Sequence, residues 1–233
     1  MPAAGRGVRL GPGDPKALRL LGGAPLLVHA VRALARSSGV EAVVVAAPAN
    51  DVAAVQRLLG RQVLGVDVWV VPGGDTRQRS VAAALTALPA HIDTVLVHDA
   101  ARPLVPVELV TRVVAALRDG AAAAIPVLPV PDTLKEIESV GASGRVVRTV
   151  DRTRLRAVQT PQGFRRDVLT QAHEAALVDG VETTDDAGLV ERIGVEVVVV
   201  PGAEDAFKVT RPLDLALAEA VLAGRRAARS SQL

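Results

Sequence analysis

The sequence is poor in several residue types, and each shortage argues against a class of protein. It has 233 residues and no cysteine, which excludes disulfide bonds and thiolate metal sites. Tyrosine is absent, and the chain has only one tryptophan and two phenylalanines. Proteins that bind single-stranded nucleic acid stack bases on aromatic side chains. This shortage, together with a net charge of only +2, therefore argues against a nucleic-acid partner.

Membrane features are lacking as well. The sequence has no apolar run of roughly 20 residues, the length of a membrane-spanning helix, and its first residues show no signal-peptide pattern. We therefore expect a cytoplasmic protein without a membrane partner. Hydrophobic residues nevertheless make up 49% of the chain, and most are alanine, valine or leucine. Such small side chains are typical of parallel strands covered by alanine-rich helices.

Lysine is scarce in a chain that is rich in arginine. Of the 27 basic residues, only Lys16, Lys135 and Lys208 are lysines. Arginine thus serves as the general surface cation, and we interpret the lysines as positions that need a compact ammonium group. The alternative, that each lysine stands where it does by chance, remains open.

Short apolar strands alternate with longer helices along much of the chain. Helical spacing from residue 25 to 38 is followed by an apolar strand from 41 to 48, and the alternation continues to about residue 130. This order predicts an α/β fold with a single Rossmann-like, doubly wound, mostly parallel sheet. The length and the absence of repeats predict one domain, residues 1–233.

The alternation is interrupted at about residues 132–152. Two short β-like runs flank a Gly-Ala-Ser-Gly turn, and the segment has no helical pattern. We predict a β-hairpin arm that projects from the sheet. Because an isolated hairpin is only marginally stable in water, we expect the arm to contact a second copy of the chain in a homodimer.

Three loops are candidate ligand sites, since ligands of open α/β sheets bind where strands end. In the first loop, "PAAGRGVRLGPGDPK", Gly5 and Gly7 allow backbone amides to approach an anion, and Arg9 and Lys16 add positive charge. Amides and two cations together suit a triphosphate. Taken alone, the glycines would be explained equally well by a mobile terminal tail.

The second loop, "PGGDTRQRS", follows an expected strand and opens a helix. Its backbone and the hydroxyl of Ser80 are candidates for contacts with the edge of a base, together with Gly74 and Asp75. The alternative is an ordinary strand-to-helix turn in which Asp75 or Thr76 caps the helix.

The third loop, "VHDAARP", also lies at the end of an expected strand. His98 and Asp99 are candidate ligands of a metal or a phosphate, and Arg102 is a candidate cation. A buried histidine that is satisfied by hydrogen bonds is the alternative interpretation of His98.

These segments closely resemble the 2-C-methyl-D-erythritol 4-phosphate cytidylyltransferase family of the non-mevalonate isoprenoid pathway. The likeness extends from Pro2 to Leu222 and rests on motifs in matching order: "PAAGRGVRL…PK", "GGDTRQRS", "VHDAARP", "DTLKEI", "TVDR", "QTPQGF", "TDDAGLVE" and "FKVTRPLDLALAE". It implies a nucleotidyltransferase that moves CMP from CTP to the sugar-alcohol phosphate and releases pyrophosphate. It also implies Mg²⁺ or another divalent cation, and a homodimer joined by the arms.

The resemblance also implies roles for individual residues. Positions matching Arg9 and Lys16 hold the triphosphate, and those matching Arg152 and Lys208 hold the acceptor phosphate for in-line attack. We expect Asp99 to contact Mg²⁺ or its waters. The residues expected to bind the nucleotide are Ala3, Ala4, Gly5, Gly7, Gly74, Asp75 and Ser80. The residues expected around the acceptor are Arg102, Thr160, Thr184 and Thr133, the last supplied by the arm of the partner subunit.

The sequence departs from the family pattern in two places. "AFKVT" replaces the usual Asn-Ile-Lys, so an amide is missing at Ala206. If that amide orients the lysine loop in the family, another group must do so here. The family also has an apolar strand before Pro-Ala-Ala-Gly, where this chain has only Met1. Removing an interior strand would leave about ten backbone groups unpaired at about 1 kcal/mol each, against a total stability of roughly 5–15 kcal/mol.

From the second departure we hypothesise that the start codon was misassigned and that the native protein begins about ten residues upstream. We accordingly expect the 233-residue chain to fold poorly and to bind CTP weakly. Intact-mass measurement of the protein from its own cell tests this expectation, which a native terminus at Met1 or Pro2 contradicts.

Two other functions remain open at this point. Transfer of CMP to ribitol 5-phosphate uses nearly the same loops, and a catalytically impaired nucleotide-binding homologue would follow from a missing strand. The presence of Arg9, Lys16, Arg152 and Lys208 argues against the impaired homologue. A dehydrogenase is disfavoured because the glycine loop carries cations and has no later acidic ribose ligand.

Overall fold

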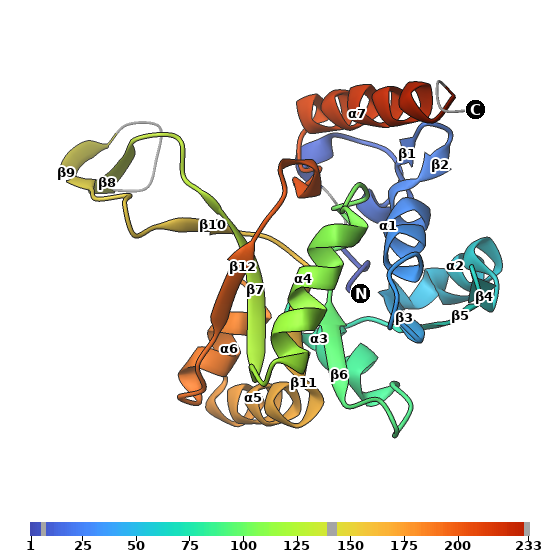
Figure 1. Cartoon of the computed structure of the whole chain (residues 1–233), viewed down its shortest axis with the longest axis horizontal. Coiled ribbons are helices and arrows are strands. Elements are labelled where there is room, and N and C mark those ends of the chain that lie inside the picture. The colour runs from blue at the N-terminus through green and yellow to red at the C-terminus, as the bar shows by residue number, and fades with distance from the viewer. Residues whose placement is uncertain (6–7, 139–143, 231–233) are drawn as a thin grey trace.

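Two β-sheets lie at the centre of the molecule, as Figure 1 shows for the computed structural model, which describes residues 1–5, 8–138 and 144–230. In the first sheet, β3 (Ala42–Ala47) pairs in parallel with β5 (Val66–Pro72), and β5 pairs with the short antiparallel strand β4 (Gln62–Val63). Five of the six residues of β3 are buried, because helices cover both of its faces.

The second sheet has the order β10-β7-β11-β6, with β12 on the other edge of β7. The strand β11 runs antiparallel between β6 and β7, whereas β12 is parallel to β7. The bounds of its strands are β6 Thr94–Val97, β7 Ala123–Pro129, β10 Arg156–Val158, β11 Gln162–Arg165 and β12 Val198–Pro201.

Helices flank these sheets, and a long terminal helix packs beside a small two-stranded sheet (Figure 1). The helices are α1 Leu26–Ala35, α2 Val52–Leu59, α3 Arg77–Thr86, α4 Val107–Arg118, α5 Arg166–Asp179, α6 Asp186–Arg192 and α7 Pro212–Ser230. The small sheet consists of β1 (Leu20–Leu21) and β2 (Ala24–Pro25). The 3₁₀ turns are Val8–Leu10, Lys16–Leu18, Ala49–Asp51 and Glu204–Ala206. Across the described residues, no helix has both the length and the apolar character required to cross a membrane.

The α/β class predicted from the sequence is confirmed, with two differences in the sheet. The antiparallel strand β11 was not predicted, because "QTPQGF" is too short and too polar to signal a strand. Instead of one continuous sheet there are two, and among the described strands β3 and β6 form the facing ends. The first residues of the chain lie against β3, where Pro2 forms a parallel bridge with Ala46.

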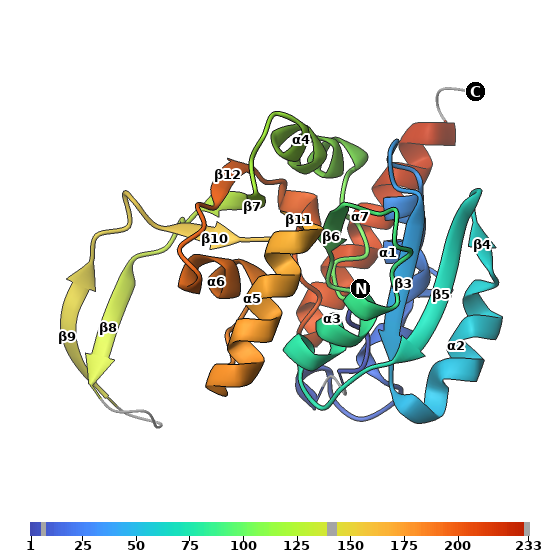
Figure 2. The ribbon, with the colours of Figure 1, turned by 90° about the horizontal axis from the view of Figure 1, so that it is seen from below.

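A two-stranded antiparallel pair occupies the segment expected to form the arm. Its strands are β8 (Leu134–Glu138) and β9 (Arg145–Val150), and they project far from the body of the molecule, as Figure 2 shows most clearly. Every residue of β8 is exposed. Most of the expected Gly-Ala-Ser-Gly turn falls within residues 139–143, outside the described residues.

Candidate functional site

A pocket of about 210 Å³ lies where β3, β5 and β6 end. Segments that are far apart in the sequence meet there, as expected at the carboxyl edge of parallel strands. Its lining residues are Pro2, Ala3, Ala4, Gly5, Lys16, Ala17, Gly74, Asp75, Thr76, Arg77, Ser80, Asp99, Ala100, Ala101 and Lys208. Two of the three lysines of the chain thus lie in the same pocket.

The glycine loop after β5 is held tightly against the rest of the pocket. A Cβ on Gly73 would lie 2.9 Å from the Cβ of Ala4 and 2.9 Å from the Oγ of Ser80, so this close approach requires glycine. The hydroxyl of Ser80 donates to the Thr76 carbonyl at 2.9 Å and accepts from the Gly74 N–H at 3.1 Å. Thr76 caps α3 by accepting from the N–H of Arg79. These bonds fix the shape of the loop.

Asp99 is the negative centre of the pocket. One carboxylate oxygen lies 3.1 Å from the Nε of Arg77, and the other lies 2.7 Å from the Nζ of Lys208. Burial alone would raise the pKa of Asp99, but the positive charges of Arg77 and Lys208 outweigh it and hold that pKa well below its ordinary value. Asp99 is therefore ionised at neutral pH, and it fixes the ammonium of Lys208 in the pocket.

A buried network of polar side chains connects Asp99 to α5 and α6 through Arg77. Arg77 also contacts Asp186 at 2.6 Å, and Asp186 in turn lies 3.0 Å from the Nε2 of His173. The side chain of Asp186 is only 1% exposed, so it depends on these partners. The network joins α3, α5 and α6 to the end of β6, and it holds Arg77 between two carboxylates.

His98 is buried and neutral, because burial lowers its pKa to about 4. Its Nε2 lies 3.1 Å from the carbonyl of Arg102, which only accepts, so Nε2 carries the proton. Nδ1 therefore accepts from the hydroxyl of Thr160, at 3.0 Å, while that hydroxyl accepts from the N–H of Asp99, at 3.0 Å. His98 and Thr160 thus orient the backbone that carries Asp99.

Lys16 carries an unusually acidic ammonium group. Burial lowers its pKa to about 8, the positive charge of Lys208 contributes to the same shift, and Asp99 partly opposes both effects. The charge of Arg9 adds to the repulsion. Three cationic side chains, Lys16, Arg77 and Lys208, thus line the pocket with two carboxylates, Asp75 and Asp99, which favours an anionic ligand.

Arg102 contacts the backbone at position 206, where the sequence departs from the family pattern. Its guanidinium donates to the carbonyl of Ala206 at 2.6 Å, and the N–H of Val209 donates to the carbonyl of Ala101 at 2.9 Å. Ala206 itself is fully buried. These two hydrogen bonds join the lysine loop to the "HDAARP" segment through backbone carbonyls.

The pocket gathers most, but not all, of the predicted site residues. Arg9 and Thr184 are exposed, Thr160 is buried, and Arg102 is half-buried; none of these four lines the pocket. Thr133 and Arg152 lie near the base of the arm, where Arg152 donates to the carbonyls of Val130 and Pro131. Gly7 lies outside the described residues. The roles of these residues remain predictions.

Sequence reasoning missed the residues that support the pocket. Arg77 was given no role, although it lies within the quoted loop, because its partner Asp186 is 109 positions away. Gln162 was missed as well. Its side-chain oxygen accepts from the N–H groups of Asp186 and Ala187, and its amide donates to Asp185, the residue that caps α6.

The pocket suits a metal ion that a ligand phosphate helps to coordinate better than an ion coordinated by protein side chains alone. No group of three or more metal-ligating side chains occurs in the part of the chain that the structure describes. Asp99 is a buried carboxylate, whereas the side chain of Asp75 is 93% exposed. Mg²⁺ is commonly held by one or two carboxylates while substrate phosphates and water complete its coordination, so Asp99 suits such an ion.

Fold and pocket together define an α/β protein with a cation-lined pocket at the carboxyl edge of its strands. Comparisons with known proteins identify the family. A sequence profile of the 2-C-methyl-D-erythritol 4-phosphate cytidylyltransferase family (IspD) matches residues 1–224. The chain belongs to this family, and it is therefore an enzyme of the nucleotidyltransferase class.

Individual relatives support the same assignment. The chain is 61% identical to the 2-C-methyl-D-erythritol 4-phosphate cytidylyltransferase of Streptomyces avermitilis, over 97% of this chain and 91% of the relative. It is 59% identical to the enzyme of the same name from Frankia casuarinae, over 96% of this chain and 80% of the relative. The crystal structure of the enzyme from Thermus thermophilus is similar with a TM-score of 0.73 and 42% identity, over 89% of this chain and 94% of that chain.

Proposed function

We propose that the chain transfers CMP from CTP to 2-C-methyl-D-erythritol 4-phosphate and releases pyrophosphate. The observation that carries the proposal is the convergence of Lys16 and Lys208 on one pocket. In that pocket Asp99 lies between Arg77 and Lys208, which neutralise its charge. The relatives that share most of this chain are named for the same reaction.

The reaction needs positioning and charge stabilisation rather than a protein nucleophile. An oxygen of the acceptor phosphate attacks the α-phosphorus of CTP and forms a new P–O bond. The bond from the α-phosphorus to the bridging oxygen breaks, and pyrophosphate leaves with the electron pair. Two polyanions must approach each other in this step, so cations have to offset their repulsion.

The two pocket lysines suit the two halves of this task. Lys16 follows the N-terminal loop and is placed to contact the triphosphate, with Arg9 nearby. Lys208 is fixed by Asp99 on the opposite loop and is placed to contact the acceptor phosphate. When Mg²⁺ is bound, it would neutralise developing negative charge on the phosphates, and Asp99 would hold it together with substrate oxygens. The tight loop around Gly74 and Ser80 is the expected contact for the cytosine.

We further propose that the protein acts as a homodimer in which each arm reaches a second copy. The arm carries exposed apolar side chains that face no core, with Ile137 55% and Val146 54% exposed and paired across the two strands. Thr133 and Arg152 lie at the base of the arm, away from the pocket of their own chain. A second copy would both cover the apolar pair and bring these residues to a pocket.

The dimer proposal is tested by substituting the arm. Ile137→Glu places a charge on the apolar pair and is expected to convert dimers to monomers in light scattering at micromolar concentration. Leu177→Glu is the matched control, because Leu177 is 75% exposed on α5, which is not part of the arm. Unchanged mass for Ile137→Glu would contradict the proposed arm contact.

The catalytic proposal is tested by pyrophosphate release from CTP. Release is expected with 2-C-methyl-D-erythritol 4-phosphate and a divalent cation, and not without an acceptor. Parallel reactions with ribitol 5-phosphate identify the acceptor, and ATP or UTP in place of CTP tests the base. Faster release with ribitol 5-phosphate would overturn the proposed acceptor. A cytoplasmic location remains a prediction of the sequence.

A further inference from the structure

An exposed stretch of the N-terminal loop, residues 11–14, lies between two buried residues. Leu10 and Ala17 each pack in an apolar cluster and are only 8% and 5% exposed. All four residues between 11 and 14 are exposed, so apolar packing does not fix the path of this stretch. The path matters for the candidate pocket, because Lys16 lines the pocket and follows the stretch by two residues.

The side chain of Arg19 turns back along the chain and spans this stretch. Its Nε donates to the carbonyl of Asp14 at 2.9 Å, and its Nη2 donates to the carbonyl of Gly11 at 2.6 Å. We call these two hydrogen bonds the Arg19 bridge. A guanidinium is planar and its donors have a fixed spacing, so this one side chain sets the separation of the two carbonyls.

Glycine at position 13 gives the guanidinium room to lie against the loop. A Cβ on Gly13 would lie 2.7 Å from the Nη1 of Arg19 and 2.8 Å from its Cζ, so a larger residue would displace the guanidinium. The φ angles of Gly11 and Gly13 are +83° and +133°, which side chains other than glycine rarely adopt. The two glycines therefore both shape the turn and admit the Arg19 side chain.

The backbone of Arg19 is itself held in place. Its N–H donates to the carbonyl of Lys16 at 3.3 Å, and its carbonyl accepts from the N–H of Leu26 at 2.9 Å. Leu26 is the first residue of α1 and is fully buried. Arg19 thus connects the exposed stretch to the packed body of the protein, while its own side chain does not line the candidate pocket.

We propose that Arg19 is a positioning residue that holds the N-terminal loop in the shape that binds the triphosphate of a nucleotide. The inference rests on the proposed function, in which Arg9 and Lys16 of this loop contact the triphosphate. A loop that is ordered before its ligand arrives loses less conformational entropy on binding. Arg19 should therefore increase affinity without touching the ligand, and only for ligands that carry β- and γ-phosphates.

The test compares substitutions in the full chain. Arg19→Leu removes the Arg19 bridge. Arg19→Lys keeps the positive charge, but a single ammonium nitrogen cannot reproduce the spacing of two guanidinium donors. Arg112→Leu is the matched control, because Arg112 on α4 also donates to two backbone carbonyls, those of Pro201 at 3.0 Å and Gly202 at 3.2 Å.

Two measurements are made on each chain. Calorimetric titration gives the affinities for CTP and for CMP, and both Arg19 variants should bind CTP roughly 10-fold more weakly while CMP affinity changes by less than about twofold. Nuclear magnetic resonance relaxation gives the backbone order parameters of Gly11 and Gly13 without any nucleotide. These should fall from roughly 0.85 to below about 0.6 in both Arg19 variants. Arg112→Leu should change none of these quantities.

Three results would overturn the proposal. Full affinity for CTP in Arg19→Lys would mean that charge alone suffices. Equal losses for CTP and CMP in Arg19→Leu would mean general damage to the pocket, and unchanged order parameters would mean that the Arg19 bridge does not order the loop. The proposed function fails in a different way, because the unsubstituted chain itself would then bind no CTP or release no pyrophosphate.

Discussion

The pocket and the arm both carry opposite charges in close contact, but their surroundings differ. In the pocket, Arg77 lies 2.6 Å from Asp186, whose side chain is 1% exposed. On the arm, Arg145 lies 2.7 Å from Glu138, but their side chains are 81% and 62% exposed. Water and salt screen the arm pair, whereas the buried carboxylate has no alternative to its partner. Distance alone therefore says little about the strength of an ion pair.

The largest expected difference between the two regions is in stability. Arg77→Leu removes the shared partner of Asp99 and Asp186, so we expect the free energy of unfolding to fall by about 3–5 kcal/mol. Arg145→Leu removes an exposed partner of Glu138 and should change it by at most about 0.5 kcal/mol. Urea denaturation of the two variants measures both values. Equal losses of unfolding free energy in the two variants would contradict the difference between the pocket pair and the arm pair.

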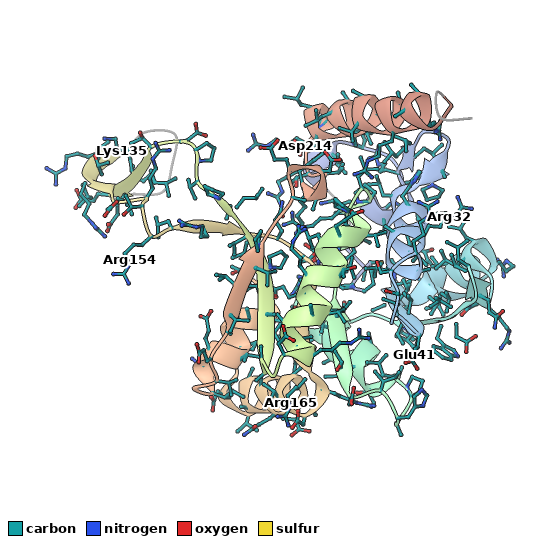
Figure 3. The ribbon with its side chains drawn as sticks, in the orientation of Figure 1. Arg32, Glu41, Lys135, Arg154, Arg165 and Asp214 are labelled. Atoms are coloured by element: carbon teal, nitrogen blue, oxygen red, sulfur yellow. The ribbon has the colours of Figure 1, made fainter. Side chains whose placement is uncertain are left out.

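The next difference is in catalysis. Lys208→Met should lower kcat for pyrophosphate release by about 10²–10³-fold, because a fixed cation no longer holds the acceptor phosphate for attack. Lys135→Met is the matched control, since Lys135 lies on the arm and its Nζ contacts Thr149 at 2.6 Å (Figure 3). This variant should keep kcat within about twofold of the unsubstituted chain. A comparable loss in both variants would contradict a special role for the pocket lysine.

A smaller effect is expected from pH. Lys16 has a pKa of about 8, so its ammonium is largely charged at pH 7 and largely neutral at pH 9. The affinity for CTP should therefore fall as pH rises through 8, by up to about tenfold. Lys16→Arg keeps its charge over this range and should show a nearly flat profile. Calorimetric titration with CTP at pH 7, 8 and 9 compares the two chains, and parallel profiles would count against Lys16.

The smallest effect is expected on the arm itself. Arg148 lies 2.6 Å from Glu136, but both side chains are well exposed. Glu136→Gln should change the free energy of unfolding by at most about 0.5 kcal/mol, and the change should disappear at 1 M salt. Urea denaturation at low and high salt measures it. A loss of several kcal/mol would contradict the weak pairing expected of exposed side chains.

The sequence predicted features that depend on neighbouring residues better than contacts between residues that are far apart in the chain. Helical spacing and the apolar runs predicted the α/β class, and the glycine and lysine loops predicted most of the pocket lining. The support of Asp99 could not be predicted in the same way, because Arg77 meets Asp186 only after α3 and α6 have packed. Likewise, β11 is a strand because β6 and β7 present edges to it, not because its own residues favour extended backbone.

The departure at Ala206 shows the same limit. From the sequence, the lost amide called for another group to orient the lysine loop, but nothing in the sequence indicated which one. In the structure, the guanidinium of Arg102 contacts this loop by donating to the backbone carbonyl of Ala206. A carbonyl is present whatever the side chain, so a contact of this kind leaves no pattern in the residue types.

The most direct test of the catalytic account compares pyrophosphate release by the unsubstituted chain and by the double variant Lys16→Met, Lys208→Met. The account predicts acceptor-dependent release from CTP by the unsubstituted chain and a loss of about 10⁴-fold or more in the double variant, with its fold retained. Release at an undiminished rate by the double variant would contradict it.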